Sequence, residues 1–322
     1  MNALEAALTD LRITGAVLLH ERYSPGTSIA VPREQALRAL LGHGPRVKVA
    51  PFHLVLNGEF TLAISGGKQS RLVRHDVAIC LNGSAHQLRF GRAGSPTPIE
   101  DVLAGRLRNA SPEPERDTEL ICGVFTMHMP PLNPLMAALP KVMLCHTDGE
   151  AASPLLAKAR EMLALELRTA SRASDQFTRA RLLEIFFAET LRAHRAAAKS
   201  PPNWFKGVGD PKISMALTAF HAMPGAHWSV ERLAAHAALS PSRFAARFRD
   251  TLGVTAMDYV AQWRINLACR KIESSDETLD AIAFDVGYGG GAALSKAFKD
   301  RLGCSPTQWR MRATENSSPC RD

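Results

Sequence analysis

The spacing of apolar residues divides the chain into two parts. Up to about residue 150, short apolar runs alternate with Gly, Pro and Asn, a pattern typical of β-strands joined by tight turns. From Ser153 onward, apolar residues recur every three or four positions, which predicts amphipathic helices. A chain of 322 residues is long enough for two domains. We therefore expect a two-domain α+β protein with a β-rich N-terminal domain and an all-α C-terminal domain.

The N-terminal part predicts a small sandwich or barrel. Two apolar runs, 52–56 and 59–64, flank Asn57-Gly58, and this pattern predicts a β-hairpin. A stretch rich in Pro, Gly and charge, 91–117, is expected to be a loop. Further strands are expected at 77–81, 86–90 and 120–126.

Two amphipathic helices are expected at about 154–198. Their apolar positions are Leu155, Leu156, Ala159, Met162, Leu163 and Leu167, then Leu182, Leu183, Phe186, Phe187 and Leu191. These helices could pack on the β-domain or form a dimer seam, and the sequence leaves both open. A Lys-Ser-Pro-Pro-Asn stretch from Lys199 ends the second helix. We expect domains at 1–198 and 211–314, a linker at 199–210 and a disordered tail at 315–322.

An internal repeat is the most informative feature of the C-terminal part. Residues 230–253 align with residues 279–303 when the second unit has one extra residue in its turn. Each unit predicts a short helix, a tight turn and a second helix. In the first unit, Ser240 can cap the second helix, with Pro241 at its first position. This is the helix-turn-helix arrangement, in which the second helix enters the major groove of DNA.

The segment between the two units also predicts a helix, at about 258–272. About 15 helical residues span roughly 23 Å. With the turns, the two second helices could lie about 34 Å apart, the spacing of successive major grooves. One chain could then bind two neighbouring grooves.

Several segments give the C-terminal part a family resemblance. They read WSVERLA (228–234), SPSRFAARF (240–248), YVAQWRINLA (259–268), IAFDVGY (282–288) and GCSP (303–306). Residues 204–312 as a whole resemble the DNA-binding domain of AraC/XylS-type transcription regulators. The resemblance implies two helix-turn-helix units joined by a linker helix, with double-stranded DNA and RNA polymerase as partners. We expect an activator, but the sequence leaves the choice between activation and repression open.

The N-terminal part resembles the cupin-like sensor domain of one branch of that family. The segments are FHLVLNGE (52–59), NGSAH (82–86), CGVF (122–125) and PLMAALP (134–140). The resemblance implies a cupin-like β-barrel with packed helices that senses a small-molecule or oxidant effector. A homodimer is compatible with this architecture.

The candidate DNA contacts lie on the second helix of each unit. They are Ser240, Ser242, Arg243, Arg247 and Arg249 in the first unit, and Ser295, Lys296 and Lys299 in the second. Arg243 and Arg247 share one helix face, and arginine can bind guanine through two hydrogen bonds. The alternatives are contacts to phosphate alone or a solvated face.

The second unit departs from the family pattern. Residues 289–291 are all glycine, and the alignment places Ala293 opposite Arg243 and Ala297 opposite Arg247. Alanine carries no hydrogen-bonding group, so we expect the first unit to read sequence and the second to bind phosphate through lysines. The glycines are expected to weaken the start of the helix by about 1 kcal/mol for each internal glycine.

The candidate effector or redox residues are His53, His86, Cys80 and Cys122. Enzymatic cupins use two closely spaced histidines, a glutamate and a later histidine. Only His53, Glu59 and His86 come near that pattern here, so we expect no metal, no cofactor and no catalytic residue. The cysteines could be inert buried groups or a thiol switch, and a small organic effector is a further option.

Composition narrows the class of protein. The net charge is +8, from 39 basic and 31 acidic residues, which favours a polyanionic partner but is spread along the chain. The six cysteines form no CxxC pair, so we expect reduced thiols and no zinc cluster. We find no apolar stretch of about 18 residues and no secretory signal, so we expect no membrane span and a cytoplasmic location.

Three functions compete at this point. A sequence-specific transcription regulator is favoured by the tandem repeat. A cupin-type metalloenzyme with a DNA-targeting tail is disfavoured by the missing histidine. A nucleoid-type binder without sequence preference is disfavoured by Arg243 and Arg247.

Overall fold

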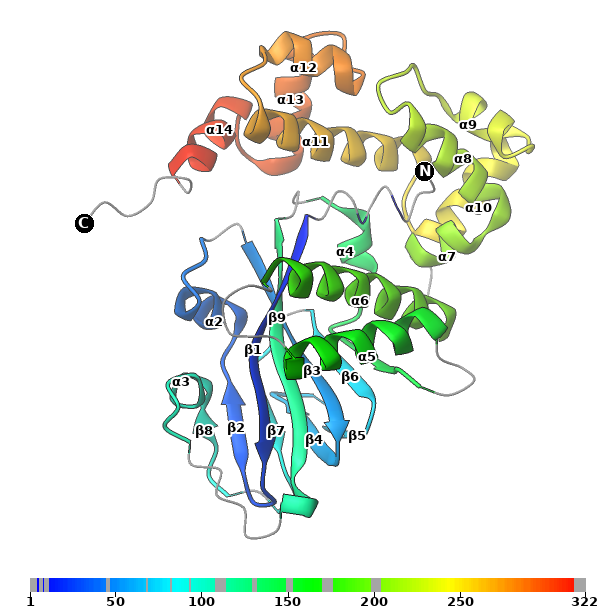
Figure 1. The fold of residues 1–322 in the computed structure, drawn as a ribbon. Helices are drawn as coiled ribbons and strands as arrows, with labels where there is room; N and C mark the ends of the chain where they lie inside the picture. The colour runs from blue at the N-terminus through cyan, green and yellow to red at the C-terminus, as the bar shows by residue number, and fades with distance from the viewer. Residues whose placement is uncertain are drawn as a thin grey trace. The chain divides into compact units, whose positions relative to one another are not determined.

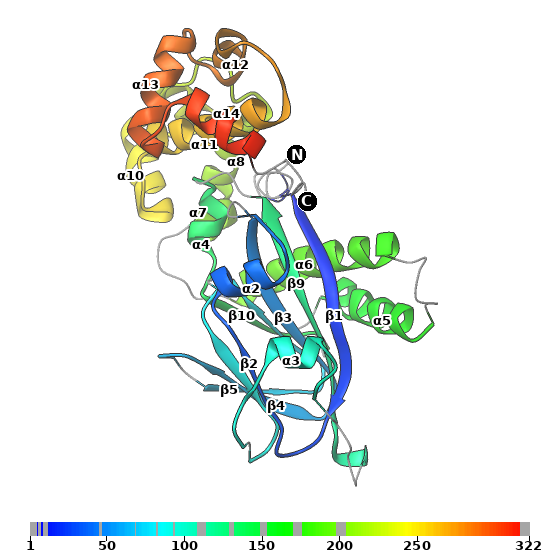
Figure 2. The ribbon, with the colours of Figure 1, turned by 90° about the vertical axis from the view of Figure 1, so that its left-hand side faces the viewer.

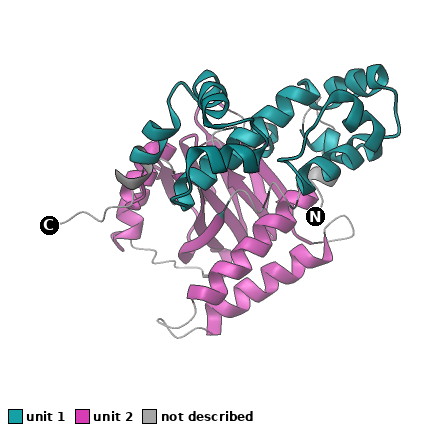
Figure 3. Cartoon of the chain, turned by 90° about the horizontal axis from the view of Figure 1, so that it is seen from above, with its two compact units in different colours: residues 1–12, 129–138, 199–322 teal, residues 13–128, 139–198 magenta. Residues whose placement is uncertain are grey.

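The computed structural model describes residues 5, 8, 12–44, 47–67, 69–81, 83–92, 94–107, 114–128, 132–148, 153–169, 176–197 and 204–315. The chain divides into two compact units (Figure 3). The sheet unit comprises residues 13–128 and 139–198, and the helical unit comprises residues 1–12, 129–138 and 199–322. Residues 199–203 of the expected linker, and the tail after Glu315, lie outside the described residues.

The sheet unit contains two five-stranded sheets (Figure 1). The first has the order β1 (Ile13–Tyr23), β9 (Thr118–His128), β3 (Val47–Asn57), β6 (Asp76–Cys80) and β10 (Val142–His146). The second has the order β5 (Gln69–Val73), β4 (Glu59–Ile64), β7 (His86–Arg89), β2 (Ser28–Val31) and β8 (Thr97–Pro98). The expectation of a β-rich domain is confirmed, but the described strands form two open sheets and no closed barrel.

The expected hairpin at Asn57-Gly58 is wrong. Strand β3 already has β9 and β6 as neighbours, so neither of its edges is left for β4, which pairs with β5 and β7 in the other sheet. Gly58 has φ of +75°, and a Cβ there would lie 2.8 Å from Thr118 Oγ1. Thr118 Oγ1 also accepts the N–H of Glu59 at 3.2 Å. The Asn-Gly pair therefore marks a corner where the chain passes between sheets.

A hydrophobic core fills the space between the two sheets. Its buried members include Tyr23, Phe60, Leu72, Leu88, Phe90 and Leu120. Side chains alternate in direction along a strand, so the inward face of the first sheet carries Val55, Ala78, Cys80, Leu120 and Cys122.

The opposite face of the first sheet is covered by helices α5 (Pro154–Thr169) and α6 (Gln176–Ala197) (Figure 2). The rings of Phe125 and Phe187 lie 4.9 Å apart. Packing of these helices on the β-domain is thereby confirmed. On α5, however, Leu155 and Met162 are 61% and 53% exposed, so the expected apolar face is wrong at those two positions.

The expected loop at 91–117 contains short elements. They are β8, α3 (Ile99–Leu103) and the 3-10 turn η1 (Pro114–Arg116). Ile99 and Val102 are buried in the core between the sheets, so an irregular loop was the wrong expectation for this part. A further short helix, α2 (Glu34–Leu40), follows β2.

The helical unit contains the repeat. Its helices are α4 (Pro134–Ala138), α7 (Trp204–Gly209), α8 (Pro211–Ala222), α9 (Val230–His236), α10 (Pro241–Leu252), α11 (Ala256–Ser274), α12 (Leu279–Val286), α13 (Gly291–Leu302) and α14 (Pro306–Glu315). Helix α7 lies in the segment expected to be a linker, and its Trp204, Phe205 and Val208 are buried. No described helix combines the length and the apolar character that crossing a membrane requires.

Candidate nucleic-acid interface and buried histidine cluster

The two helix-turn-helix units, α9–α10 and α12–α13, have matching geometry. Helix α10 ends at Gly253, whose φ is +78° and whose N–H donates to Arg249 O at 2.8 Å. Helix α13 ends at Gly303, whose φ is +69° and whose N–H donates to Lys299 O at the same distance, 2.8 Å. The register predicted between the two repeats is confirmed.

The second helices begin in different ways. Ser240 is the N-cap of α10, with Pro241 after it, but its side chain makes no capping hydrogen bond, so that detail of the prediction is wrong. At the start of α13, Asp280 of the preceding helix accepts the N–H of Gly291 at 2.6 Å. Only Gly291 of the three glycines lies inside α13, so the helix loses less stability than the sequence suggested.

Helix α10 buries one face and exposes a cationic one. Phe244 and Phe248 are buried. The predicted contacts Ser242, Arg243 and Arg249 are exposed, and Arg243 forms no ion pair with any described residue. The Oγ atoms of Ser240 and Ser242 lie 3.5 Å apart.

Arg247 is also exposed but has a partner within the helical unit. Its Nη2 lies 2.7 Å, and its Nε 2.9 Å, from Oδ2 of Asp210. Asp210 is the N-cap of α8 and accepts the backbone N–H groups of Lys212 and Ile213. The structure therefore separates the two arginines that the sequence treated as equivalent.

Helix α13 presents a different surface. Leu294 and Phe298 are buried at the positions of Phe244 and Phe248 in α10. Lys296 and Lys299 are exposed, and Ser295 is half-buried. Ala293 is exposed and Ala297 half-buried, so the positions equivalent to Arg243 and Arg247 offer no hydrogen-bonding group.

Arg264 of α11 connects the two helix-turn-helix units. Its guanidinium donates to Pro224 O at 3.0 Å and Ala226 O at 2.7 Å, both before α9, and to Gly287 O at 2.9 Å, in the turn after α12. A side chain at Gly287 would collide with this guanidinium, since a Cβ there would lie 2.5 Å from Arg264 Nη2. One planar group thus fixes segments of both helix-turn-helix units.

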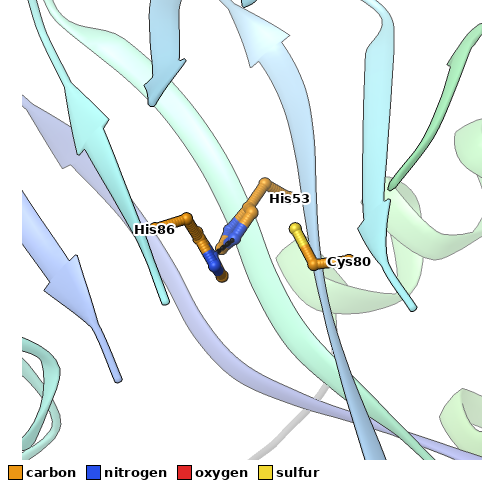
Figure 4. Close-up of side chains that lie close together, drawn as sticks. All are labelled: His53, Cys80 and His86. Carbon is orange, nitrogen blue, oxygen red and sulfur yellow. Dashed lines mark hydrogen bonds between the residues drawn. The ribbon is translucent and has the colours of Figure 1, made fainter. Parts of the chain in front are cut away.

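The sheet unit brings all four candidate sensor residues together. His53 of β3 pairs with Cys122 of β9, and its Nδ1 lies 3.2 Å from Cys122 Sγ. Its Nε2 lies 2.9 Å from Nε2 of His86, which comes from β7 in the opposite sheet. Cys80 of β6 completes the group (Figure 4). All four side chains are buried.

Burial controls the titration of this cluster. It holds the pKa of His53 well below its usual range, and the neighbouring His86 lowers it further. Burial also lowers the pKa of His86, although a hydrogen bond to Ser84 O opposes this. It raises the pKa of the Cys80 thiol to about 12 and that of Cys122 as well. Neither thiol has the low pKa typical of a reactive cysteine.

A pocket of about 440 Å³ opens on the second sheet. It is lined in part by Ala63, Gln69, His86, Arg89 and Glu100. It combines apolar walls with a few charged groups, as small-molecule sites do. His86 belongs both to this lining and to the buried cluster.

Known protein families match both the N-terminal and the C-terminal part of the chain. A cupin family model matches residues 2–196, and a helix-turn-helix domain model matches residues 233–312. The chain belongs to the cupin family, and its C-terminal part carries a helix-turn-helix domain of the AraC type. A putative AraC-like transcription regulator of Streptomyces lividans is 41% identical over 134 residues, 41% of this chain and 44% of that protein. The chain thus covers less than half of this relative and of a similar one from Streptomyces antibioticus.

A second relative aligns over a longer stretch of the chain. The transcriptional regulator AlkR of Acinetobacter baylyi is 29% identical over 271 residues, 81% of this chain and 87% of AlkR. Among solved structures, the DNA-binding domain of AdpA in complex with a target DNA is 30% identical, covers 33% of this chain and 95% of that one, and has a TM-score of 0.31. ToxT from Vibrio cholerae is 10% identical over 95% of this chain and 99% of its own, with a TM-score of 0.37.

Sequence reasoning missed three residues that shape the helix-turn-helix units. Asp210 binds Arg247, Asp280 caps α13, and Arg264 ties the units together. Only Arg264 left a signal, as a cation among the apolar positions of a helix. The two aspartates look like ordinary surface residues until the fold places them.

Proposed function

We propose that the chain is a sequence-specific regulator of transcription that binds double-stranded DNA. One observation carries the proposal: α10 and α13 share one register, bury equivalent faces and expose a cation at one equivalent position, Arg249 in α10 and Lys299 in α13. Second helices of this kind insert their N-terminal residues into the major groove. RNA polymerase is the expected partner of such a regulator at a promoter.

The two helix-turn-helix units have different roles in DNA binding. Arg243 is exposed near the start of α10 and can donate two hydrogen bonds to guanine O6 and N7. Helix α13 offers Lys296 and Lys299, which bind phosphate as point charges. The first unit therefore reads sequence, and the second anchors the protein on the neighbouring groove.

The sheet unit is the part of the chain that binds the effector. The pocket of about 440 Å³ on the second sheet has the size and mixed lining of a small-molecule site. A small organic effector is favoured over a thiol switch, because burial raises the pKa of Cys80 and Cys122. Exposed apolar side chains on α5 and α6, including Leu155, Met162 and Ile185, support a homodimer.

One arrangement speaks against a cupin-type metalloenzyme. Glu59, the only carboxylate near the enzymatic pattern, is 52% exposed and hydrogen-bonds Arg71 on the neighbouring strand. It does not join His53 and His86, so the histidine-glutamate set of enzymatic cupins is not assembled.

A genomic binding map with the full chain, followed by footprinting with the purified protein, tests the proposal. We expect a few discrete sites, each with protection over two successive major grooves on one face of the duplex. Arg243→Ala should weaken the footprint on the first groove, so that protection there requires a higher protein concentration. Arg71→Ala, which removes the same charge from the sheet unit, should leave it intact.

Equal binding to genomic and scrambled DNA would overturn sequence specificity and support the nucleoid-type binder. Protection confined to one groove would contradict the role of the second unit. A map without discrete sites, from a chain that is folded by circular dichroism, would contradict the regulator altogether.

A further inference from the structure

Three potential metal ligands converge between the two sheets. His53, Cys80 and His86 each offer one ligand atom, and these atoms lie within 4.8 Å of one another. They come from β3, β6 and β7, so both sheets contribute. Figure 4 shows the two imidazole rings meeting tip to tip, with the sulfur of Cys80 beside them. The register of the strands, and not one flexible loop, sets this arrangement.

The hydrogen bonds around the rings leave two nitrogens facing each other. Nδ1 of His86 donates to Ser84 O at 3.0 Å, so its Nε2 carries a lone pair. That lone pair points at Nε2 of His53, 2.9 Å away. When Nδ1 of His53 donates to Cys122 Sγ, which lies 3.2 Å away, His53 also presents a lone pair. Two lone pairs at this separation repel unless a cation lies between them.

The donor set selects the kind of cation. Two imidazoles and a thiolate suit zinc and other borderline transition metals, whereas calcium and magnesium require oxygen ligands. Two nitrogens bound to a tetrahedral zinc at 2.0–2.1 Å would lie roughly 3.3 Å apart. The observed 2.9 Å is a few tenths of an ångström short of that, a difference that small side-chain rotations supply.

We propose that His53 Nε2, His86 Nε2 and Cys80 Sγ bind one Zn²⁺ between the two sheets. The Cys80 thiol loses its proton to the solvent when the metal binds. Cys122 stands behind His53 and orients its ring, as carbonyl or carboxylate partners do at other metal-bound histidines. Three protein ligands leave a fourth position for water or an effector atom.

This site differs from the sequence expectation of no metal and from the enzymatic cupin set. A thiolate takes part, and Glu59 does not, because it lies on the exposed side of β4 beside Arg71. The ion would connect β7 of one sheet to β3 and β6 of the other. Its binding therefore couples metal occupancy to the packing of the sheet unit.

A metal-free alternative satisfies the same distances. Cys122 S–H could donate to His53 Nδ1, and His53 Nε2–H could donate to His86 Nε2. In that arrangement Cys80 has no special role. A measurement that depends on the Cys80 sulfur therefore separates the two accounts.

The experiment uses the full chain, stripped with a chelator, dialysed and titrated with Zn²⁺ and, separately, with Co²⁺. We expect one zinc per chain by elemental analysis after desalting. Co²⁺ should give a thiolate-to-cobalt charge-transfer band together with the intense visible bands of tetrahedral cobalt. Cys80→Ser should remove the charge-transfer band and weaken Zn²⁺ binding by at least about 100-fold, since it deletes a ligand.

Two further cysteine variants test whether the loss of metal binding is specific to Cys80. Cys122→Ser should keep the band and weaken Zn²⁺ binding by about 10–100-fold, as expected for an orienting partner. Cys145→Ser is the matched control, because Cys145 lies on β10 and donates to Thr190 O, outside the cluster. It should leave both the band and the affinity unchanged.

Circular dichroism identifies the variants that fold, and His86→Gln replaces Cys80→Ser if the latter does not. Less than one tightly held zinc in the wild-type chain would overturn the proposal. So would a band of equal strength in Cys80→Ser or His86→Gln, which would show an adventitious ion only. These readouts do not involve DNA, so the site and the regulatory function stand or fall separately.

Discussion

Arg247 of α10 is bound to Asp210, the residue that caps α8, through Nη2 and Nε of one guanidinium. Burial alone would raise the pKa of Asp210, but hydrogen bonds from Arg247 and from the backbone of Ile213 and Lys212 hold it below its usual range. The arginine is 47% exposed and the aspartate 13%, so the pair sits at the edge of the helical unit. Arg247, one of the two arginines predicted to contact bases, is thus already paired with a residue of the same chain.

Arg243→Ala should weaken binding to a specific site more than Arg247→Ala does. Arg243 forms no ion pair with any described residue, so its donors are available to guanine, whereas Arg247 must release Asp210 first. We expect a loss of about 1–3 kcal/mol for Arg243→Ala, with relaxed base preference at one position. Competition binding by fluorescence anisotropy, with single-base variants of the site, measures both effects.

Asp210→Asn is the matched variant for this comparison. Asparagine caps helices as well as aspartate does, so α8 should keep its cap while Arg247 loses its ionic partner. The ion pair would have no bearing on DNA recognition if Arg243→Ala and Arg247→Ala weakened DNA binding equally and if Asp210→Asn changed neither loss.

Lys299→Ala should weaken binding to all DNA sequences by a similar factor. Lys299 is exposed on α13, where neighbouring alanines offer no hydrogen bond to a base, and the proposed partner of Lys299 is a phosphate. Removing one phosphate contact should reduce the slope of log K against log salt by about one. Titrations across a series of salt concentrations, on specific and scrambled duplexes, give this slope. A loss confined to the specific duplex would contradict the anchoring role.

The helical unit was largely predictable because its signals are local. The repeat sets the register, and Pro241 and Gly253 mark the limits of α10. The sheet unit was less predictable, because strand pairing depends on distant residues. Strand β1 was missed since its buried and exposed positions do not alternate cleanly. The hairpin at Asn57-Gly58 failed because both edges of β3 are taken by strands far along the chain.

The candidate sites show the same limit. Exposed cations on α10 and α13 follow from helix periodicity, so residues such as Arg243 and Lys299 were found. The partner of Arg247 is 37 positions away, and His53 and Cys122 are 69 positions apart. No spacing rule reaches that far. His53, His86, Cys80 and Cys122 were recognised as candidates one by one, but only the two facing sheets show that they form a single cluster.

Arg264→Ala should uncouple the two helix-turn-helix units. It removes three hydrogen bonds to backbone carbonyls, and we expect a loss of about 2–3 kcal/mol in the stability of the helical unit. Binding to a duplex long enough to present both grooves should fall more than binding to a shortened duplex that presents only the groove bound by the first unit. Anisotropy titrations on the two duplexes measure this ratio.

Arg264→Lys separates charge from geometry. Lysine keeps the charge but cannot reproduce the planar fork that reaches three carbonyls. We expect it to show most of the uncoupling seen in Arg264→Ala. An unchanged ratio between the two duplexes in both variants would mean that other contacts set the spacing of the units.

His221 should make the stability of the helical unit depend on pH. Its Nε2 lies 2.9 Å from the hydroxyl of Tyr259, which also accepts Trp204 Nε1–H at 2.9 Å. Burial lowers the pKa of His221 to about 3, whereas an unfolded histidine titrates near 6.5. Between these values the unfolded chain binds a proton that the folded chain does not, so stability falls as the pH drops below about 6.5.

His221→Gln removes this titration while keeping an acceptor for the Tyr259 hydroxyl. The variant should be less stable than the wild type at about pH 7.5, and the difference should shrink by up to about 1.4 kcal/mol per pH unit below about 6.5. Urea unfolding followed by tryptophan fluorescence measures it selectively, because all four tryptophans lie in the helical unit. His227→Gln, at an exposed histidine, is the control and should follow the wild-type curve. If His221→Gln followed it too, the acid sensitivity of this unit would have to come from another group.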